Sequence, residues 1–198
     1  LRIAFLCPGG EITFMALTFS ETLAPGMPIP DFSLPDVVTS APVTPASLAG
    51  PKALVIIFLC RHCPYVGHVL PEVVRLAGHY LPREVAFAGI SANDAVTYPD
   101  DSPANLAKMA AEQRLPFPVL HDDSQKVARA FHAVCTPEFF VFDRAHHLYY
   151  HGRFDGSTPG NGVACDGSDL RHALDALLAG AAVPDLQQPS MGCNIKWK

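Results

Sequence analysis

The feature that most constrains this chain is a short apolar run that ends in two closely spaced cysteines. Residues 53–59 (ALVIIFL) carry no charge and are rich in β-branched side chains, which is typical of a strand buried on both faces. Cys60 and Cys63 follow, and beyond Pro64 apolar residues recur at helical spacing as far as Leu81. The sequence therefore predicts two cysteines at the junction between a central strand and a helix.

The start of a helix has chemical consequences for a sulfur placed there. The first amides of a helix lack intrahelical partners, and the helix dipole favours negative charge at that end. We therefore expect the pKa of Cys60 to lie below that of a free cysteine, with Cys63 near enough to close a small disulfide. Positive charge on His62 favours thiolate over disulfide and makes the pair more oxidising. Arg61 either adds to this effect or is a solvated surface residue.

Four stretches, in this order, resemble one group of proteins: CRHCPYV, SANDAVTYPDD, VCTPEFFVFD and the ending GCNIKWK. Over residues 25–198 the chain is similar to a CxxC-containing bacterial branch of the thioredoxin-like proteins. That branch is related to the peroxiredoxins of the alkyl hydroperoxide reductase and thiol-specific antioxidant superfamily. The resemblance implies a cis bond between Thr136 and Pro137 that faces the two cysteines. There the backbone of Thr136 would pair with an extended substrate segment.

The order of the predicted elements gives the fold class. Strands alternate with helices and then end in a hairpin and a final helix, which predicts an α/β thioredoxin-like fold: a central mixed sheet with helices on both faces. We also expect an N-terminal β-hairpin within residues 24–51 and an irregular tail over 184–198. Residues 1–14 are expected to be an extension with little structure, and residues 15–198 a single domain. The other predicted strands span 85–91, 117–120, 138–142 and 147–152, and the other helices begin near 103 and 125 and span 169–179.

Composition argues against several classes of function. The net charge is −5 and there are no runs of Lys or Arg, so nucleic acid and anionic membrane are poor partners. No apolar stretch approaches the length needed to span a membrane. Of the six cysteines, only Cys60 and Cys63 have a motif spacing, which favours a reducing cytoplasm over a secreted disulfide framework. A zinc site would need a second pair of ligands at metal spacing, and none is evident, so we expect no bound metal or organic cofactor.

The leading hypothesis is a thiol–disulfide oxidoreductase that exchanges electrons between a protein or small-molecule disulfide and an external dithiol, as a monomer or homodimer. Cys60 attacks the substrate disulfide, and Cys63 then displaces Cys60 and releases the reduced substrate. Three alternatives stay open. They are an atypical peroxiredoxin-like thiol peroxidase, a metal-binding or metallochaperone module that holds Cu(I) through the two cysteines and a His, and an interaction domain with an unreactive pair.

The resemblance also shows departures from the related families. Cys60 stands where the peroxiredoxins have a Thr, and Cys63 stands where they have the peroxidatic Cys. The hydroxyl that would orient a peroxide is therefore missing. Leu54 stands where thioredoxin has a buried acid, so proton transfer needs another group.

The other cysteines are less constrained by the sequence. Cys135, beside the Thr-Pro pair, is either an extra resolving cysteine or a buried free thiol. Cys193 lies in the tail, where it is either a small buried residue or one with a role that the pattern does not reveal. Cys7 and Cys165 lie in loop-like segments and have no assigned role. The polar residues 93–94 either line the site or form a turn.

Overall fold

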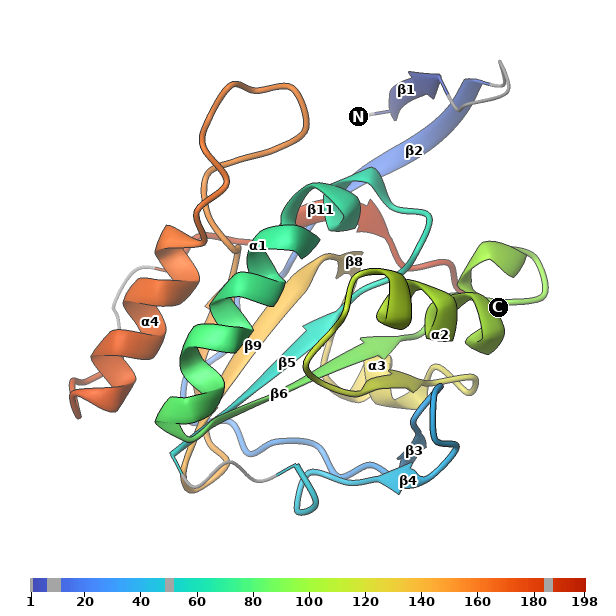
Figure 1. Cartoon of the computed structure of the whole chain (residues 1–198). Coiled ribbons are helices and arrows are strands. Elements are labelled where there is room, and N and C mark those ends of the chain that lie inside the picture. Colours follow the sequence, from blue (N-terminus) through green and yellow to red (C-terminus); the bar gives the residue numbers. More distant parts are fainter. Residues whose placement is uncertain (1, 7–11, 49–51, 184–186) are drawn as a thin grey trace.

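The computed structural model describes residues 2–6, 12–48, 52–183 and 187–198. Its centre is a mixed five-stranded sheet in the order β10-β9-β5-β6-β7, as expected for an α/β fold (Figure 1). β5 pairs with β6 and β6 with β7 in parallel, whereas β5–β9 and β9–β10 are antiparallel. The strands are β5 (Ala53–Phe58), β6 (Val85–Ser91), β7 (Val119–His121), β9 (Glu138–Asp143) and β10 (Leu148–Gly152).

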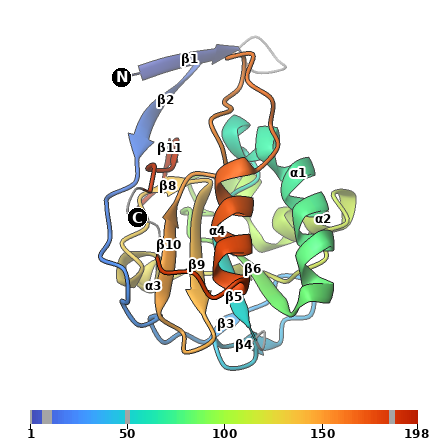
Figure 2. The same ribbon diagram turned by 90° about the vertical axis from the view of Figure 1, so that its left-hand side faces the viewer.

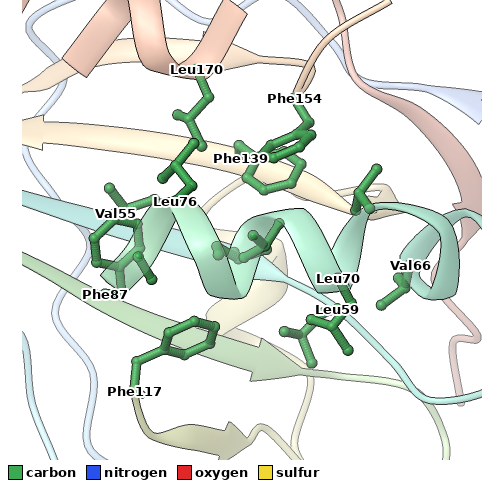
Figure 3. Packing of buried hydrophobic residues seen from close by; sticks show 14 of the residues in the cluster. Val55, Leu59, Val66, Leu70, Leu76, Phe87, Phe117, Phe139, Phe154 and Leu170 are labelled. Carbon is green, nitrogen blue, oxygen red and sulfur yellow. The ribbon is translucent and has the colours of Figure 1, made fainter. Parts of the chain in front are cut away.

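The apolar run of β5 is buried on both faces because side chains of the strand alternate between two hydrophobic clusters. Val55 and Ile57 pack with α1 (Pro64–Tyr80), α2 (Pro103–Glu112) and α4 (Ser168–Leu178). Leu54, Ile56 and Phe58 pack on the other face with residues of α3 (Lys126–Ala130) and of the N-terminal hairpin. Each such buried side chain contributes about 1.5–3 kcal/mol, so this strand fixes the position of the residues that follow it. Figure 2 shows the sheet between these layers, and Figure 3 shows Leu70 and Leu76 of α1 packed among Phe87, Phe139 and other core side chains.

The short elements complete the domain around the sheet. The expected N-terminal hairpin is formed by β3 (Leu34–Pro35) and β4 (Pro42–Val43), which pair antiparallel. Two 3-10 helices, η1 (Leu81–Arg83) and η2 (Pro99–Asp101), follow α1 and precede α2. In the part of the chain that the structure describes, no helix combines the length and apolar character needed to cross a membrane.

A second, four-stranded sheet runs in the order β1-β2-β11-β8 and corrects two expectations. The tail is not irregular throughout, since β11 (Met191–Asn194) pairs with β2 (Ile12–Phe19) and with β8 (Cys135–Thr136). Residues 1–14 were expected to have little structure, but residues 2–6 form β1 (Arg2–Leu6) and residues 12–14 belong to β2. Cys7 lies outside the described residues. That residues 15–198 form one domain stays a prediction.

The sequence-based expectation failed for β11 because neither of its partners is close in the sequence. Its pairing joins the N-terminal strand β2 to β8, and a four-residue strand has little alternation by which to recognise it. Figure 1 shows β11 beside β8, near the N-terminal end of α1.

Candidate active site

Cys60 and Cys63 lie at the predicted junction between β5 and α1. Cys63 is the N-cap residue of α1, and Pro64 occupies the first helical position, where its missing amide hydrogen has no partner to lose. The Cys60 and Cys63 residues are 0% and 1% exposed. Neither Cys60 nor Cys63 forms a disulfide with another cysteine of the described residues.

Both sulfurs contact the same residue, Thr136. The Cys60 sulfur lies 3.3 Å from the Thr136 hydroxyl oxygen, and the Cys63 sulfur lies 3.2 Å from the Thr136 carbonyl oxygen. The bond between Thr136 and Pro137 is cis, as the resemblance implied. β9 begins at Glu138, which pairs with Phe58 at the end of β5, and this register brings the Thr-Pro segment to the two cysteines.

The two thiols have opposite pKa shifts, and the expectation of an acidic Cys60 is wrong. Burial raises the pKa of Cys60 well above its ordinary value, and hydrogen bonding to Cys63 together with the negative charges of Cys63 and Asp101 raises it further. Burial also opposes ionisation of Cys63. Hydrogen bonds from the thiols of Cys193 and Cys60, and from the backbone amides of Val66 and Cys193, nevertheless hold the Cys63 pKa well below its ordinary value. These shifts therefore favour ionisation of the second cysteine, at the helix start, over ionisation of Cys60.

Asp101, at the end of η2, holds the turn between the two cysteines. Its Oδ1 atom accepts hydrogen bonds from the backbone amides of Arg61 at 2.7 Å and His62 at 3.3 Å. Its Oδ2 atom lies 2.5 Å from His62 Nδ1 and accepts from the Asn93 side chain at 2.8 Å. Burial opposes the charge of Asp101, but the hydrogen bonds from His62, Asn93 and the Arg61 amide lower its pKa below the ordinary value. The sequence analysis placed Asp101 only in a polar loop and gave it no role in the site. The stretch SANDAVTYPDD, which carries the family resemblance, was the signal that could have indicated this role.

Arg61 and His62, the residues predicted to tune the reduction potential, lie between the two cysteines but contact different neighbours. The His62 ring stacks on Tyr98 with a centroid distance of 5.6 Å, and its bond to Asp101 places a carboxylate against any positive charge on the ring. The Arg61 side chain lies 3.6 Å from Glu112 and 3.4 Å from the carbonyl oxygen of Asn105. We expect little electrostatic effect of Arg61 on the sulfurs, because an exposed ion pair is weak.

A second carboxylate, Glu138, organises the segment that precedes the cis bond. Its Oε2 atom accepts hydrogen bonds from the backbone amides of Val134 at 2.9 Å and Cys135 at 3.1 Å. Its Oε1 atom lies 2.7 Å from His151 Nε2. Burial and the nearby Glu138 carboxylate raise the pKa of Cys135 well above its ordinary value, which favours a buried free thiol over an extra resolving cysteine. Sequence reasoning missed Glu138 and His151, since both lie within stretches that were interpreted only as strands.

The polar residues 93–94 divide between the two predicted alternatives. Asn93 belongs to the site because its side chain donates to Asp101. Asp94 forms a turn, since its carboxylate accepts from the Val96 amide at 3.1 Å and from the Thr97 hydroxyl at 2.5 Å.

Cys193 completes the site. It lies in β11 directly opposite Thr136 and is 1% exposed. The backbone edge of Thr136, which was expected to bind an extended substrate segment, is therefore paired with the chain's own C-terminal strand.

Two further features bear on what could bind. Cys60, His62 and Asp101 each offer one ligand atom, and these atoms lie within 4.8 Å of one another. A carboxylate is a hard ligand, whereas Cu(I) prefers soft thiolates. This set of ligands therefore suits Cu(I) less well than the thiolate-rich set that was expected. Separately, a cavity of about 160 Å³ lies beside Tyr65 and Pro137, and no cysteine of the described residues lines it.

Comparison with known proteins agrees with the fold. Residues 25–151 match the family model described as the AhpC/TSA family. The chain belongs to the AhpC/TSA family. No curated protein matches the sequence. Two solved structures cover nearly the whole chain. One is an uncharacterized conserved protein from Geobacillus kaustophilus, with 46% identity and a TM-score of 0.91 over 93% of this chain and 97% of that one. The other is a hypothetical protein from Sinorhizobium meliloti 1021, with 39% identity and a TM-score of 0.89 over 91% of this chain and 98% of that one.

More distant structures support the thioredoxin-like fold of this AhpC/TSA protein. A putative thiol:disulfide interchange protein DsbE from Chlorobium tepidum is 18% identical, with a TM-score of 0.63 over 79% of this chain and 99% of that one. Peroxidoxin BcpB from Mycobacterium tuberculosis is 22% identical, with a TM-score of 0.60 over 80% of this chain and 98% of that one. At this identity the likeness concerns the fold, and the reaction has to be argued from the site.

Proposed function

We propose that this protein is a thiol–disulfide oxidoreductase in which Cys60 and Cys63 cycle between a dithiol and a disulfide. The observation that carries the proposal is the position of both sulfurs against Thr136, at the start of α1. Two thiols in contact, one ionised and one protonated, form a pair that can attack a disulfide and then displace the product.

The pKa shifts reverse the order of attack that the sequence suggested. The Cys63 thiolate attacks one sulfur of the substrate disulfide, and the other substrate sulfur leaves as a thiolate that takes up a proton from water. The Cys60 sulfur then attacks Cys63, which closes the Cys60–Cys63 disulfide and breaks the mixed disulfide. The second substrate sulfur leaves and takes the proton that Cys60 carried. An external dithiol returns the pair to its reduced form.

The environment of Cys60 favours this second step. Besides burial, the contacts that raise its pKa include the hydrogen bond to Cys63 and the negative charge of Cys63. Both disappear once Cys63 is part of a mixed disulfide, so Cys60 loses its proton more easily at the point where the reaction requires it. The substrate is a disulfide of a protein or small molecule, and we place the reaction in a reducing cytoplasm.

A redox titration tests the proposal. The protein is equilibrated in buffers of reduced and oxidised glutathione, free thiols are labelled, and Cys60 and Cys63 are quantified by peptide mass. We expect both thiols to lose their label together in one two-electron transition. C165S is the matched control, since the Cys165 sulfur contacts the carbonyl oxygen of His68 rather than Thr136, and it should give the same midpoint. Cys60 and Cys63 that keep their label at every potential would remove the proposal.

A thiol peroxidase is the second candidate, and a specific observation favours it. Cys63 has a lowered pKa and occupies the helix start, as a peroxide-reactive thiolate requires. Its thiolate would attack one peroxide oxygen, giving a sulfenic acid and, after uptake of a proton, water. Cys60 would then displace a second water and close the disulfide. Stopped-flow consumption of hydrogen peroxide with dithiothreitol as donor separates the two functions.

A further inference from the structure

The C-terminal strand β11 occupies the backbone edge next to the cis proline. Cys193 pairs with Thr136 and Asn194 with Cys135, while on its other side Cys193 pairs with Leu17 of β2. An extended segment with a cysteine opposite Thr136 is the arrangement expected of a bound disulfide substrate. Here the segment belongs to the same chain.

The strand is held closely against this edge. A Cβ atom on Gly192 would lie 2.0 Å from the Thr136 carbonyl oxygen, so a side chain at this position would force the strand away. Beyond the strand, the Ile195 amide donates to the carbonyl oxygen of Val134 at 3.0 Å. The Lys196 amide donates to Asn93 at 2.8 Å, and Asn93 also binds Asp101. The tail is therefore tied to the polar network of the cysteine turn as well as to β8.

The Cys193 sulfur lies at the same helix start as Cys63. Hydrogen bonding to Cys63 and burial raise the pKa of Cys193 well above its ordinary value, while the backbone amide of Tyr65 acts in the opposite direction. Cys193 and Cys60 thus both donate to one acceptor sulfur, that of Cys63. Cys63 therefore has both of the other sulfurs among its hydrogen-bond partners.

We propose that Cys193 is a third redox-active cysteine, which exchanges with the Cys60–Cys63 disulfide to form a Cys63–Cys193 disulfide. The inference rests on the proposed function of the pair. The Cys193 sulfur attacks Cys63, a Cys63–Cys193 bond forms, and the Cys60–Cys63 bond breaks. Cys60 leaves and takes the proton that Cys193 gave up, so the exchange needs no added oxidant or reductant. By the same attack Cys193 resolves a mixed disulfide on Cys63, and the substrate sulfur leaves with the proton.

The exchange gives β11 a role in the reaction cycle. While β11 is in place, a substrate segment cannot pair with Thr136, because that edge is already taken. Cys193 is then the sulfur that reaches Cys63, and the disulfide can pass from Cys60 to the thiol of the C-terminal strand.

Oxidation of the C60S variant is the direct test. The full chain is treated with oxidised glutathione, quenched in acid, alkylated and digested, and its disulfides are mapped by mass spectrometry. We expect the major product to be a Cys63–Cys193 disulfide. In C60S/C193S, Cys63 should instead keep its glutathione. The proposed role of Cys193 would be overturned if Cys63 of C60S retained glutathione while Cys193 was found alkylated.

Gly192→Ala in the C60S background is the second variant. Displacement of β11 from Thr136 should reduce the yield of the Cys63–Cys193 disulfide at least tenfold, with thermal unfolding followed by circular dichroism as the check on folding. An unchanged yield in the folded variant would contradict the proposed strand geometry. Oxidation of wild type and C193S separates the role of Cys193 from the proposed function of the Cys60–Cys63 pair. If they form the Cys60–Cys63 disulfide but C60S forms none with Cys193, only the role of Cys193 fails. If they form none, the proposed function fails.

Discussion

Two carboxylate–histidine pairs hold the two segments that meet at the sulfurs. Asp101 with His62 binds consecutive amides in the cysteine turn, and Glu138 with His151 binds consecutive amides before the cis bond. In each pair one carboxylate oxygen faces the histidine and the other faces the backbone. The same arrangement therefore fixes the site from two separate parts of the chain.

The two pairs differ in burial and in the cysteine that each one affects. The His151 and Glu138 side chains are 1% and 0% exposed, and the His151 ring stacks on Phe140 at 4.3 Å. The His62 side chain is 18% exposed. Asp101 raises the pKa of Cys60, whereas Glu138 raises the pKa of Cys135. Each carboxylate thus disfavours a thiolate on one neighbouring cysteine. Ionisation is favoured instead at Cys63, which accepts hydrogen bonds from Cys60, Cys193 and two backbone amides.

The largest expected effect is on the buried pair. Glu138→Ala leaves His151 and two backbone amides buried without their acceptor, so we expect the free energy of unfolding to fall by about 3–5 kcal/mol. Urea denaturation followed by circular dichroism measures the loss. Glu138→Gln keeps an oxygen acceptor and should cost less than half as much. A loss below about 1 kcal/mol for the alanine variant would show that this pair does not stabilise the fold.

Asp101→Ala should cost less stability but more activity. Its histidine partner is partly exposed, unlike His151, so we expect a loss of about 2–3 kcal/mol. The cysteine turn, however, loses the acceptor for its two amides, and misplacement of the sulfurs should slow disulfide exchange roughly tenfold or more. Insulin reduction with dithiothreitol measures the rate. Glu138→Gln is the matched control. If both variants slow disulfide exchange equally, the Asp101–His62 pair has no greater effect on activity than the Glu138–His151 pair.

The junction of β5 and α1 could be predicted because its signal is local. An uncharged apolar run, two cysteines and a change to helical spacing all lie within residues 53–81. The cis bond followed from the resemblance rather than from the spacing of residues. Only the junction is a property that a short stretch of sequence carries by itself.

The ionisation of the pair could not be predicted in the same way. A helix start next to Cys60 suggested an acidic first cysteine, but the donors that decide the charge include Cys193, which arrives on β11 from the end of the chain. The roles of Asp101 and Glu138 likewise depend on amides brought to them by the fold. Long-range pairing, rather than local pattern, therefore brings the donors that lower the pKa of Cys63.

The dependence of the free energy of unfolding on acid pH gives a third, smaller effect, which concerns Asp101. The pKa of Asp101 is lowered in the folded protein, so its carboxylate stabilises the fold at pH values above the unfolded pKa of about 3.9. That contribution is lost as the pH falls through the unfolded and then the folded pKa. We expect wild type to lose more stability than Asp101→Asn on going from about pH 5 to pH 2, by urea denaturation at each pH. Parallel curves would contradict this assignment.

The smallest effect is expected at His62. Gln in this position can still donate to Asp101 but carries no positive charge. Because Asp101 lies 2.5 Å from the ring nitrogen, the carboxylate already offsets such a charge. We therefore expect His62→Gln to lower the reduction potential of the Cys60–Cys63 couple by less than about 30 mV, which corresponds to about 1.4 kcal/mol.

Equilibration with glutathione buffers measures this shift, with Arg61→Gln as the matched control. Arg61 pairs with the exposed Glu112 at 3.6 Å, so its removal should leave the potential unchanged within the error of the titration. A fall of roughly 60 mV or more in the His62 variant would mean that the histidine acts on the sulfurs despite its carboxylate partner. In that case the Asp101–His62 pair would set the potential as well as the geometry of the turn, and its difference from the Glu138–His151 pair would be larger than burial alone implies.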